Sequence, residues 1–114
     1  MTKFKIVLVP FPFDDLSNEK VRPAVCLTDP IGTYRHVVLA FITSRLPEEL
    51  LDTDLILSND DDGFEKTGLR VTSTVRLHRM MTVTTSLILR ELGQLTASQQ
   101  ASVNRKIAHL FDLW

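Results

Sequence analysis

Cysteine is almost absent from this chain: Cys26 is the only one, so no internal disulfide can form. A single thiol is typical of proteins in a reducing compartment, and we therefore expect a cytoplasmic location. Long apolar runs are also missing, because no stretch approaches the ~20 residues that a helix needs to span a bilayer. No secretory signal pattern is visible near the N-terminus. These absences argue against a disulfide-stabilised secreted domain and predict no membrane partner.

Several sequence signatures of catalysis are absent as well. The chain has no glycine-rich phosphate loop, no cysteines or histidines at metal-ligand spacing and no nucleophile elbow. The acidic turn 58–63 superficially resembles a calcium loop. With Gly63 in the glycine position, however, the first and twelfth ligands would be Ser58 and Leu69, and neither offers the carboxylate that calcium needs. We therefore predict no bound metal and no cofactor.

Charge is unevenly distributed along the chain. The formal net charge of −1 argues weakly against indiscriminate binding of nucleic acid. Residues 48–65 nevertheless contain acidic side chains but no lysine or arginine, whereas residues 66–90 contain basic side chains but no acid. Such a split can give a neutral protein a basic face. Alternatively, the two segments neutralise each other as neighbouring strands.

The pattern of apolar residues predicts a β-rich domain. The composition is that of an ordinary globular protein, and 114 residues fit one domain, 1–114. Runs rich in β-branched and aromatic residues predict short strands over 4–11, 21–28, 35–43, 53–57, 69–77 and 92–95. In the first run, the continuous apolar stretch Ile6–Val9 indicates burial on both faces, and Pro10 and Pro12 should end the strand.

A single helix is predicted at the end of the chain. Thr96 and Gln99 have the spacing of a capping box, so the helix should span about residues 97–112. Apolar residues then recur at helical spacing in one stripe that docks on the sheet: Val103, Ile107, Leu110, Phe111 and Trp114. The predicted fold class is therefore mainly β: a small antiparallel β-barrel of five to seven strands with a C-terminal helix.

Two short segments carry candidate chemistry. Arg22-Pro23 follows a polar loop and starts an apolar run, which suits the binding of an anion such as phosphate. In Val75–Arg79, alternation puts Arg76 and His78 on one face and the final arginine on the other, unless a bulge intervenes. Arginine can stabilise the charge of a phosphodiester while histidine moves protons near neutral pH. The alternative is that both side chains are simply solvated.

Six short blocks carry a resemblance to a known family. In order, they are IVLVPFPFDDLS (6–17), KVRPAV (20–25), FITS (41–44), VRL (75–77), TV (82–83) and LGQL (92–95). Together they resemble the MazF/PemK-like type II toxin family over nearly the whole chain. The resemblance implies an SH3-like β-barrel with a C-terminal helix and a homodimer. It also implies a sequence-specific, metal-independent endoribonuclease of single-stranded RNA. A cognate antitoxin neutralises such a toxin, and the pair commonly binds DNA.

The resemblance also implies roles for particular residues. Arg22, Thr43 and Arg76 match catalytic or phosphate-binding positions of the family, and His78 stands where some members have an acidic base. RNA-binding roles are implied for residues beside these motifs: Ser17, Lys20, Ser44 and Arg79.

Two other positions depart from the family pattern. Phe4-Lys5 replaces a common glycine and acid, and Met81 replaces a common arginine.

These roles lead to a hypothesis for the reaction. The RNA supplies its own nucleophile, the 2′-hydroxyl, so that no serine, cysteine or metal is required. His78 takes the hydroxyl proton, Arg22 and Arg76 stabilise the phosphorane charge, and Thr43 donates a hydrogen bond to the phosphate. Two alternatives remain: a non-catalytic toxin that binds a protein such as DNA gyrase, or a degenerate member without cleavage. Met80-Met81 and Trp114 would be surface anchors in the first alternative and are otherwise core residues.

Overall fold

The computed structural model describes residues 1–11 and 20–113. Its strands are β1 (Lys5–Phe11), β2 (Lys20–Cys26), β3 (His36–Thr43), β4 (Asp54–Leu57), β5 (Ser73–Thr84) and β6 (Arg90–Gln94). Two short 3-10 helices, η1 (Phe64–Thr67) and η2 (Thr85–Leu87), precede the C-terminal helix α1 (Ala97–Leu110). Among the described residues, no helix is long and apolar enough to cross a membrane.

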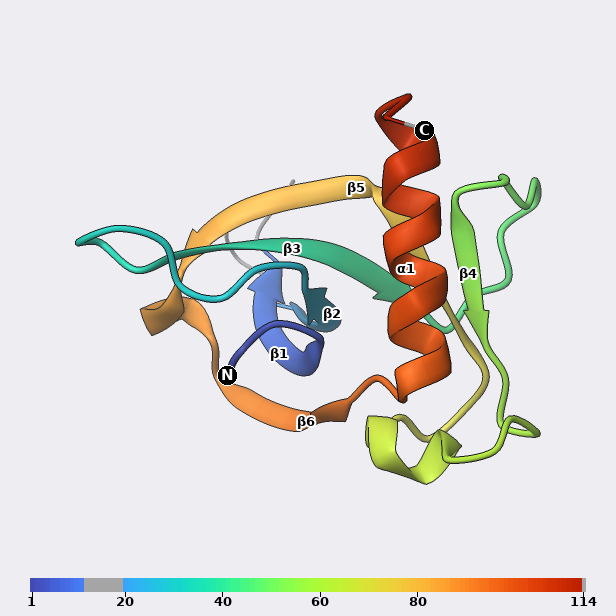
Figure 1. Cartoon of the computed structure of the whole chain (residues 1–114). Coiled ribbons are helices and arrows are strands. Elements are labelled where there is room, and N and C mark those ends of the chain that lie inside the picture. The colour runs from blue at the N-terminus through green and yellow to red at the C-terminus, as the bar shows by residue number, and fades with distance from the viewer. Residues whose placement is uncertain (12–19, 114) are drawn as a thin grey trace.

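The six strands form one antiparallel sheet in the order β4-β5-β3-β2-β1-β6. The sheet curves into a half-barrel from β5 across β3, β2 and β1 to β6, and α1 lies across it beside β4 (Figure 1). The prediction of a mainly β fold, with five to seven antiparallel strands and a C-terminal helix, is therefore confirmed.

Both faces of this sheet are buried. The helix-side core contains Phe4, Ile6, Val25, Leu27, Ala40, Ile42, Leu57, Phe64, Val75, Leu77, Leu95 and Val103. The opposite core contains Val7, Val9, Ala24, Cys26, Val37, Leu39, Phe41 and Val83. Successive residues of a strand point to opposite faces, so the unbroken run Ile6–Val9 supplies both cores, as its composition predicts.

β1 ends at Phe11, as the predicted strand 4–11 does. Pro10 does not itself interrupt the strand, because it lies opposite Val21 of β2, and Pro12 lies outside the described residues. Pairing of β1 with β6 stops at Leu8, and beyond it the missing N–H of proline is tolerated as on an edge strand. The fifth strand begins at Ser73 and runs to Thr84, because Met80 and Met81 continue it and pack against the two cores.

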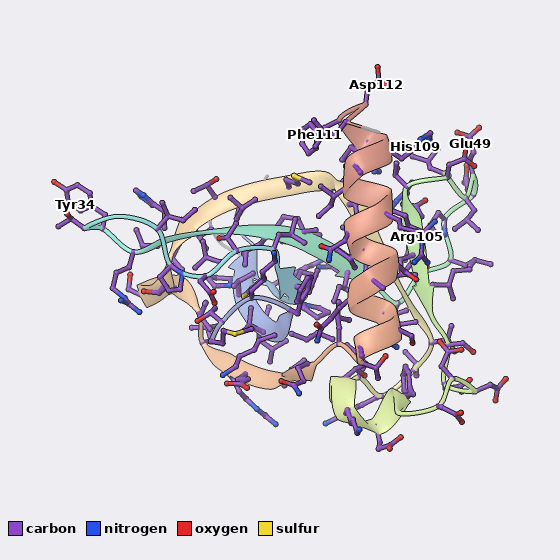
Figure 2. The ribbon with its side chains drawn as sticks, in the orientation of Figure 1. Tyr34, Glu49, Arg105, His109, Phe111 and Asp112 are labelled. Carbon is purple, nitrogen blue, oxygen red and sulfur yellow. The ribbon has the colours of Figure 1, made fainter. Side chains whose placement is uncertain are left out.

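The helix is capped as predicted. The Gln99 N–H donates to the Thr96 hydroxyl at 3.3 Å, and the Thr96 N–H donates to the Gln99 side chain at 2.8 Å. Val103, Ile107 and Leu110 face the helix-side core. Phe111 does not: it follows the last residue of α1 and is 56% exposed at the helix end (Figure 2), so its predicted place in the buried stripe is wrong. Trp114 lies outside the described residues.

Candidate active site

A groove of about 580 Å³ opens at one end of the sheet. Its described lining consists of Lys20 and Arg22 at the start of β2, the continuous segment 41–48, and Arg76 and Arg79 of β5. We call it the cationic groove. These three elements are neighbours, because β3 lies between β5 and β2 in the sheet.

Strand register explains why residues distant in sequence meet there. Phe41 of β3 lies opposite Ala24 of β2 on one side and opposite Arg76 of β5 on the other. Continuing the β2–β3 register by two residues brings Arg22 level with Thr43. Since the period of a strand is two, these side chains share one face of the sheet. The structure thus brings together Arg22, Thr43 and Arg76, as the sequence motifs predict.

The charge of the groove is strongly positive. Five cationic side chains line it, against one carboxylate, Glu48, among the described lining residues. Both interpretations of the charge split hold in part. Arg76 from the basic segment is neutralised by Asp54 from the acidic one, across neighbouring strands. Arg79, from the same basic segment, remains exposed at the groove.

Thr43 is oriented by its own loop. The Arg45 backbone N–H donates to the Thr43 hydroxyl oxygen at 3.1 Å, in a turn of the kind that serine and threonine favour. A hydroxyl that accepts one hydrogen bond still carries its own proton as a donor. Thr43 is only half-buried, so this proton is available to a ligand in the groove. Ser44, the next residue, lines the groove as well.

Arg76 is held by a buried carboxylate. Its Nε lies 3.1 Å from Oδ1 of Asp54, and its Nη2 lies 3.2 Å from Oδ2. The Asp54 side chain is fully buried, whereas 22% of the Arg76 side chain is exposed. Such a two-point contact fixes the plane of the guanidinium group.

A bulge in β5 changes the expected placement of His78. Phe41 lies opposite Arg76, but the preceding residue of β3, Ala40, lies opposite Met80, so residues 77–79 form a bulge. Strict alternation fails across it. Arg79 lines the groove beside Arg76, whereas His78 is exposed and is not among the described lining residues. The expectation that Arg76 and His78 share the groove is therefore corrected by the bulge.

The sequence pattern gave no role to three residues near this site. Arg45 and Glu48 line the groove from the loop after β3, and Asp54 lies directly behind Arg76. Loop side chains have no periodicity that would place them, and the partner of Asp54 is 22 residues away in sequence. Ser17, predicted to bind RNA, lies outside the described residues.

The described part of the chain offers no obvious metal or thiol chemistry. It contains no group of three or more histidine, cysteine or acidic side chains arranged to hold a metal ion. Burial raises the pKa of the Cys26 thiol to about 11, and Glu91 adds to the increase. A thiol with this pKa stays protonated at neutral pH and is a poor nucleophile.

Comparison with solved structures finds toxins of the same fold. The Mycobacterium tuberculosis toxin MazF-mt6 has a TM-score of 0.71 and 25% sequence identity, covering 95% of this chain and 96% of that one. An endoribonuclease from a mycobacterial species, in complex with its cognate antitoxin, has a TM-score of 0.72 and 14% identity, covering 100% and 97%. At that identity the second match supports the fold alone. Comparison with curated proteins gives no match.

The half-barrel, its terminal helix and these neighbours define the class first: a protein with the MazF-like fold. The family profile of PemK-like, MazF-like toxins of type II toxin-antitoxin systems then matches residues 2–111. The chain belongs to this toxin family, which confirms the resemblance seen in the sequence.

Proposed function

We propose that this protein is an endoribonuclease toxin that cleaves single-stranded RNA in the cationic groove. One observation carries the proposal: Arg22, Thr43 and Arg76 meet in one groove of a MazF-like fold. The five cationic side chains of the groove suit the negatively charged phosphodiester backbone of RNA. Leu46, 72% exposed, and Pro47 add an apolar surface against which an unstacked base can lie.

The proposed reaction uses the substrate's own 2′-hydroxyl as nucleophile. Its oxygen forms a bond to phosphorus while the bond from phosphorus to the 5′-oxygen breaks. The products are a 2′,3′-cyclic phosphate and a 5′-hydroxyl, whose oxygen takes up a proton from solvent as it leaves. Arg22 and Arg76 stabilise the negative charge that grows on the phosphorane, and the Thr43 hydroxyl donates to a phosphate oxygen. Preorganised donors of this kind are typically worth about 3–4 kcal/mol each.

The proton of the 2′-hydroxyl needs an acceptor in the groove. His78 is the acceptor suggested by sequence, but it is exposed outside the described lining. Glu48 is the one carboxylate among the described lining residues. A general base must lie within hydrogen-bond reach of the proton that it removes. We therefore favour Glu48 over His78 as the base. Lys20, Ser44 and Arg79 are proposed to bind the RNA backbone along the groove.

The first test is direct cleavage. Purified protein is incubated in EDTA with a long single-stranded RNA, and the fragments are separated on a gel. We expect discrete fragments with cyclic phosphate ends, and none from a substrate with 2′-deoxy at the cleaved positions. Arg22→Ala should lower the rate about 10²–10³-fold because a phosphorane donor is lost. Arg22 is exposed, so the thermal unfolding midpoint of the Arg22→Ala variant should match that of the wild type.

Intact RNA in this assay would contradict the proposal. If expression still arrested growth, the result would favour a non-catalytic toxin that binds a protein such as DNA gyrase. If growth also continued, it would favour a degenerate member of the family.

The proposed partners are a cognate antitoxin and a second copy of this chain, in the cytoplasm. Family membership supports the antitoxin, and one structural neighbour is an endoribonuclease in complex with its cognate antitoxin. Co-expression with the product of the adjacent gene should suppress cleavage and co-purify with the toxin. Sedimentation of the free toxin at twice the 12.9 kDa chain mass would support the homodimer.

A further inference from the structure

Asp54 occupies an unusual position for an acidic residue. Its side chain is fully buried directly behind the cationic groove, yet most of its hydrogen bonds serve groups that face or border that groove. Burial of a carboxylate is unfavourable unless the charge is paired and its oxygens accept hydrogen bonds. Here both conditions are met, and the partners indicate what the carboxylate does.

The first partner is Arg76, which lies directly opposite Asp54 on the neighbouring strand. Two of the five guanidinium N–H groups point at the carboxylate, through Nε and Nη2. The other three are left for the groove, which Arg76 lines. A guanidinium group fixed in this way presents its remaining donors in one direction, with little rotamer freedom to lose when a ligand binds.

The second partner is the loop that continues from the groove wall. The Leu51 backbone N–H donates to Oδ2 of Asp54 at 2.8 Å, and the Asp54 N–H donates back to the Leu51 carbonyl at 3.0 Å. Leu51 follows the wall segment 41–48 by only three residues. The Asp54 carboxylate therefore binds both Arg76 and Leu51, at the end of the loop after β3.

We propose that Asp54 is a positioning residue for RNA cleavage, acting through Arg76 and the groove wall. The proposal rests on the proposed function and extends it to a residue that does not touch the substrate. In this role, Asp54 aims the free donors of Arg76 at the phosphate and keeps the loop after β3 at a fixed distance from them. Preorganisation of donors before the substrate arrives is what makes such groups effective in a transition state.

The test is a double-mutant cycle with Asp54→Asn, Arg76→Ala and the double variant, assayed by single-turnover RNA cleavage. We expect Asp54→Asn to lower the cleavage rate about 10-fold or more, with less than a threefold change in the RNA concentration at half-saturation. In the Arg76→Ala background, Asp54→Asn should cause no further loss. Asp52→Asn is the matched control, because Asp52 is exposed in the same turn, and it should cleave as the wild type does.

Equal losses from Asp54→Asn in both backgrounds would overturn the positioning role and leave the proposed function intact. Wild-type protein that leaves RNA uncut would overturn the proposed function and this role with it. The two failures are therefore distinguishable in one experiment.

A second measurement needs only the wild-type protein, in case Asp54→Asn does not fold. The side-chain N–H signals of Arg76 are followed by NMR while an uncleavable 2′-deoxy-substituted oligonucleotide is added. We expect the Nε–H signal to remain protected from exchange, because Asp54 keeps it, while the Nη signals shift on contact with phosphate. Loss of the Nε–H protection, or no shift of any Arg76 signal, would overturn the proposal.

Discussion

At the scale of single residues, three donors in the cationic groove are restrained before a ligand arrives: Thr43, Arg76 and Arg22. The Thr43 hydroxyl accepts the Arg45 N–H and keeps its proton for a ligand. Arg76 is aligned by Asp54. Arg22 precedes proline, which restricts its backbone to extended conformations. These restraints lower the entropy that is lost when a phosphate binds.

The choice of base leads to a prediction at two adjacent glutamates. Glu48→Gln should lower the cleavage rate at least about 10²-fold, because the proton acceptor is lost. Glu49→Gln is the matched control: Glu49 points away from the sheet at the edge of the molecule (Figure 2) and does not line the groove, so its rate should be unchanged. Single-turnover rates between pH 5 and 9 measure both.

His78→Gln provides the decisive contrast. We expect its rate to stay within threefold of the wild type. A large loss there, with Glu48→Gln active, would return the role of base to His78.

Phe4 leads to a prediction about stability. Its φ of 71° is in the left-handed region, where glycine is favoured. Phe4 is nonetheless 7% exposed in the helix-side core. Phe4→Ala should therefore lose about 3–5 kcal/mol of unfolding free energy, because burial is lost while strain remains. Phe4→Gly should be about 1 kcal/mol more stable than Phe4→Ala, because it removes the strain as well.

Urea denaturation of the two variants measures the difference. Equal stabilities would mean that the conformation of Phe4 is not strained, and greater stability of Phe4→Ala would reverse the argument.

Sequence motifs located the residues of the groove that belong to strands, and missed those that depend on distant partners. Arg22 is predictable from the polar loop and apolar run that flank Arg22-Pro23, whereas Thr43 is predictable only from the resemblance to the toxin family. The role of Asp54 is not predictable, since it depends on a cross-strand register that no local pattern encodes. His78 was misplaced for the same reason: a bulge follows from how three strands meet, not from the five residues around it.

At the scale of elements, β5 shows how one strand serves both a core and a site. Before the bulge, Val75 and Leu77 face the helix-side core, and after it Met80 does, so the buried face shifts by one residue. Uninterrupted alternation would instead place Arg79 with Leu77, toward the core. The bulge thus exposes a second arginine at the groove, while Leu77 stays buried and Met80, half-buried, packs against the core. Bulges next to functional sites commonly redirect side chains in this way.

The contact between β6 and η1 leads to a prediction about Gly93. A Cβ added to Gly93 would lie 2.1 Å from the backbone oxygen of Lys66, so backbone must move to admit it. Gly93→Ala should therefore destabilise the protein by at least about 3 kcal/mol, at the upper end of overpacking effects. Gly32→Ala is the control: its φ is 73°, but no atom lies within 4 Å, so only strain of about 1–2 kcal/mol is expected.

Thermal or urea unfolding of both variants provides the comparison. A small loss for Gly93→Ala, equal to that for Gly32→Ala, would show that β6 and η1 separate readily.

At the scale of the whole molecule, the groove forms where β2 starts and β3 ends, next to β5. The type and number of the strands are predictable from composition, because continuous apolar runs signal a sheet buried on both faces. Their order in the sheet is not, since the neighbours of β3 are β2 and β5 rather than β4. That order, reached through the long segment 58–72, is what places Arg76 beside Thr43. Long-range pairing of this kind leaves little local trace in a sequence.

The buried thiol of Cys26 can be used to measure how often the sheet opens. Cys26 is fully buried in β2, where it lies opposite Leu39 of β3, so a thiol reagent reaches it only when the sheet separates. At pH 8, well below its pKa of about 11, the folded thiol is also protonated. Labelling by a disulfide reagent should therefore be slow and should follow the free energy of opening.

Occupancy of the groove should then be visible without any cleavage. An uncleavable oligonucleotide that binds the ends of β2 and β3 should slow the labelling by the factor 1 + [L]/Kd, since it binds the closed state alone. The rate at which the disulfide reagent releases its coloured thiol, measured against oligonucleotide concentration, would give the affinity of the unmodified protein. Labelling that is rapid, or whose rate does not depend on the oligonucleotide, would mean that Cys26 is reached by local fluctuations that do not open the groove.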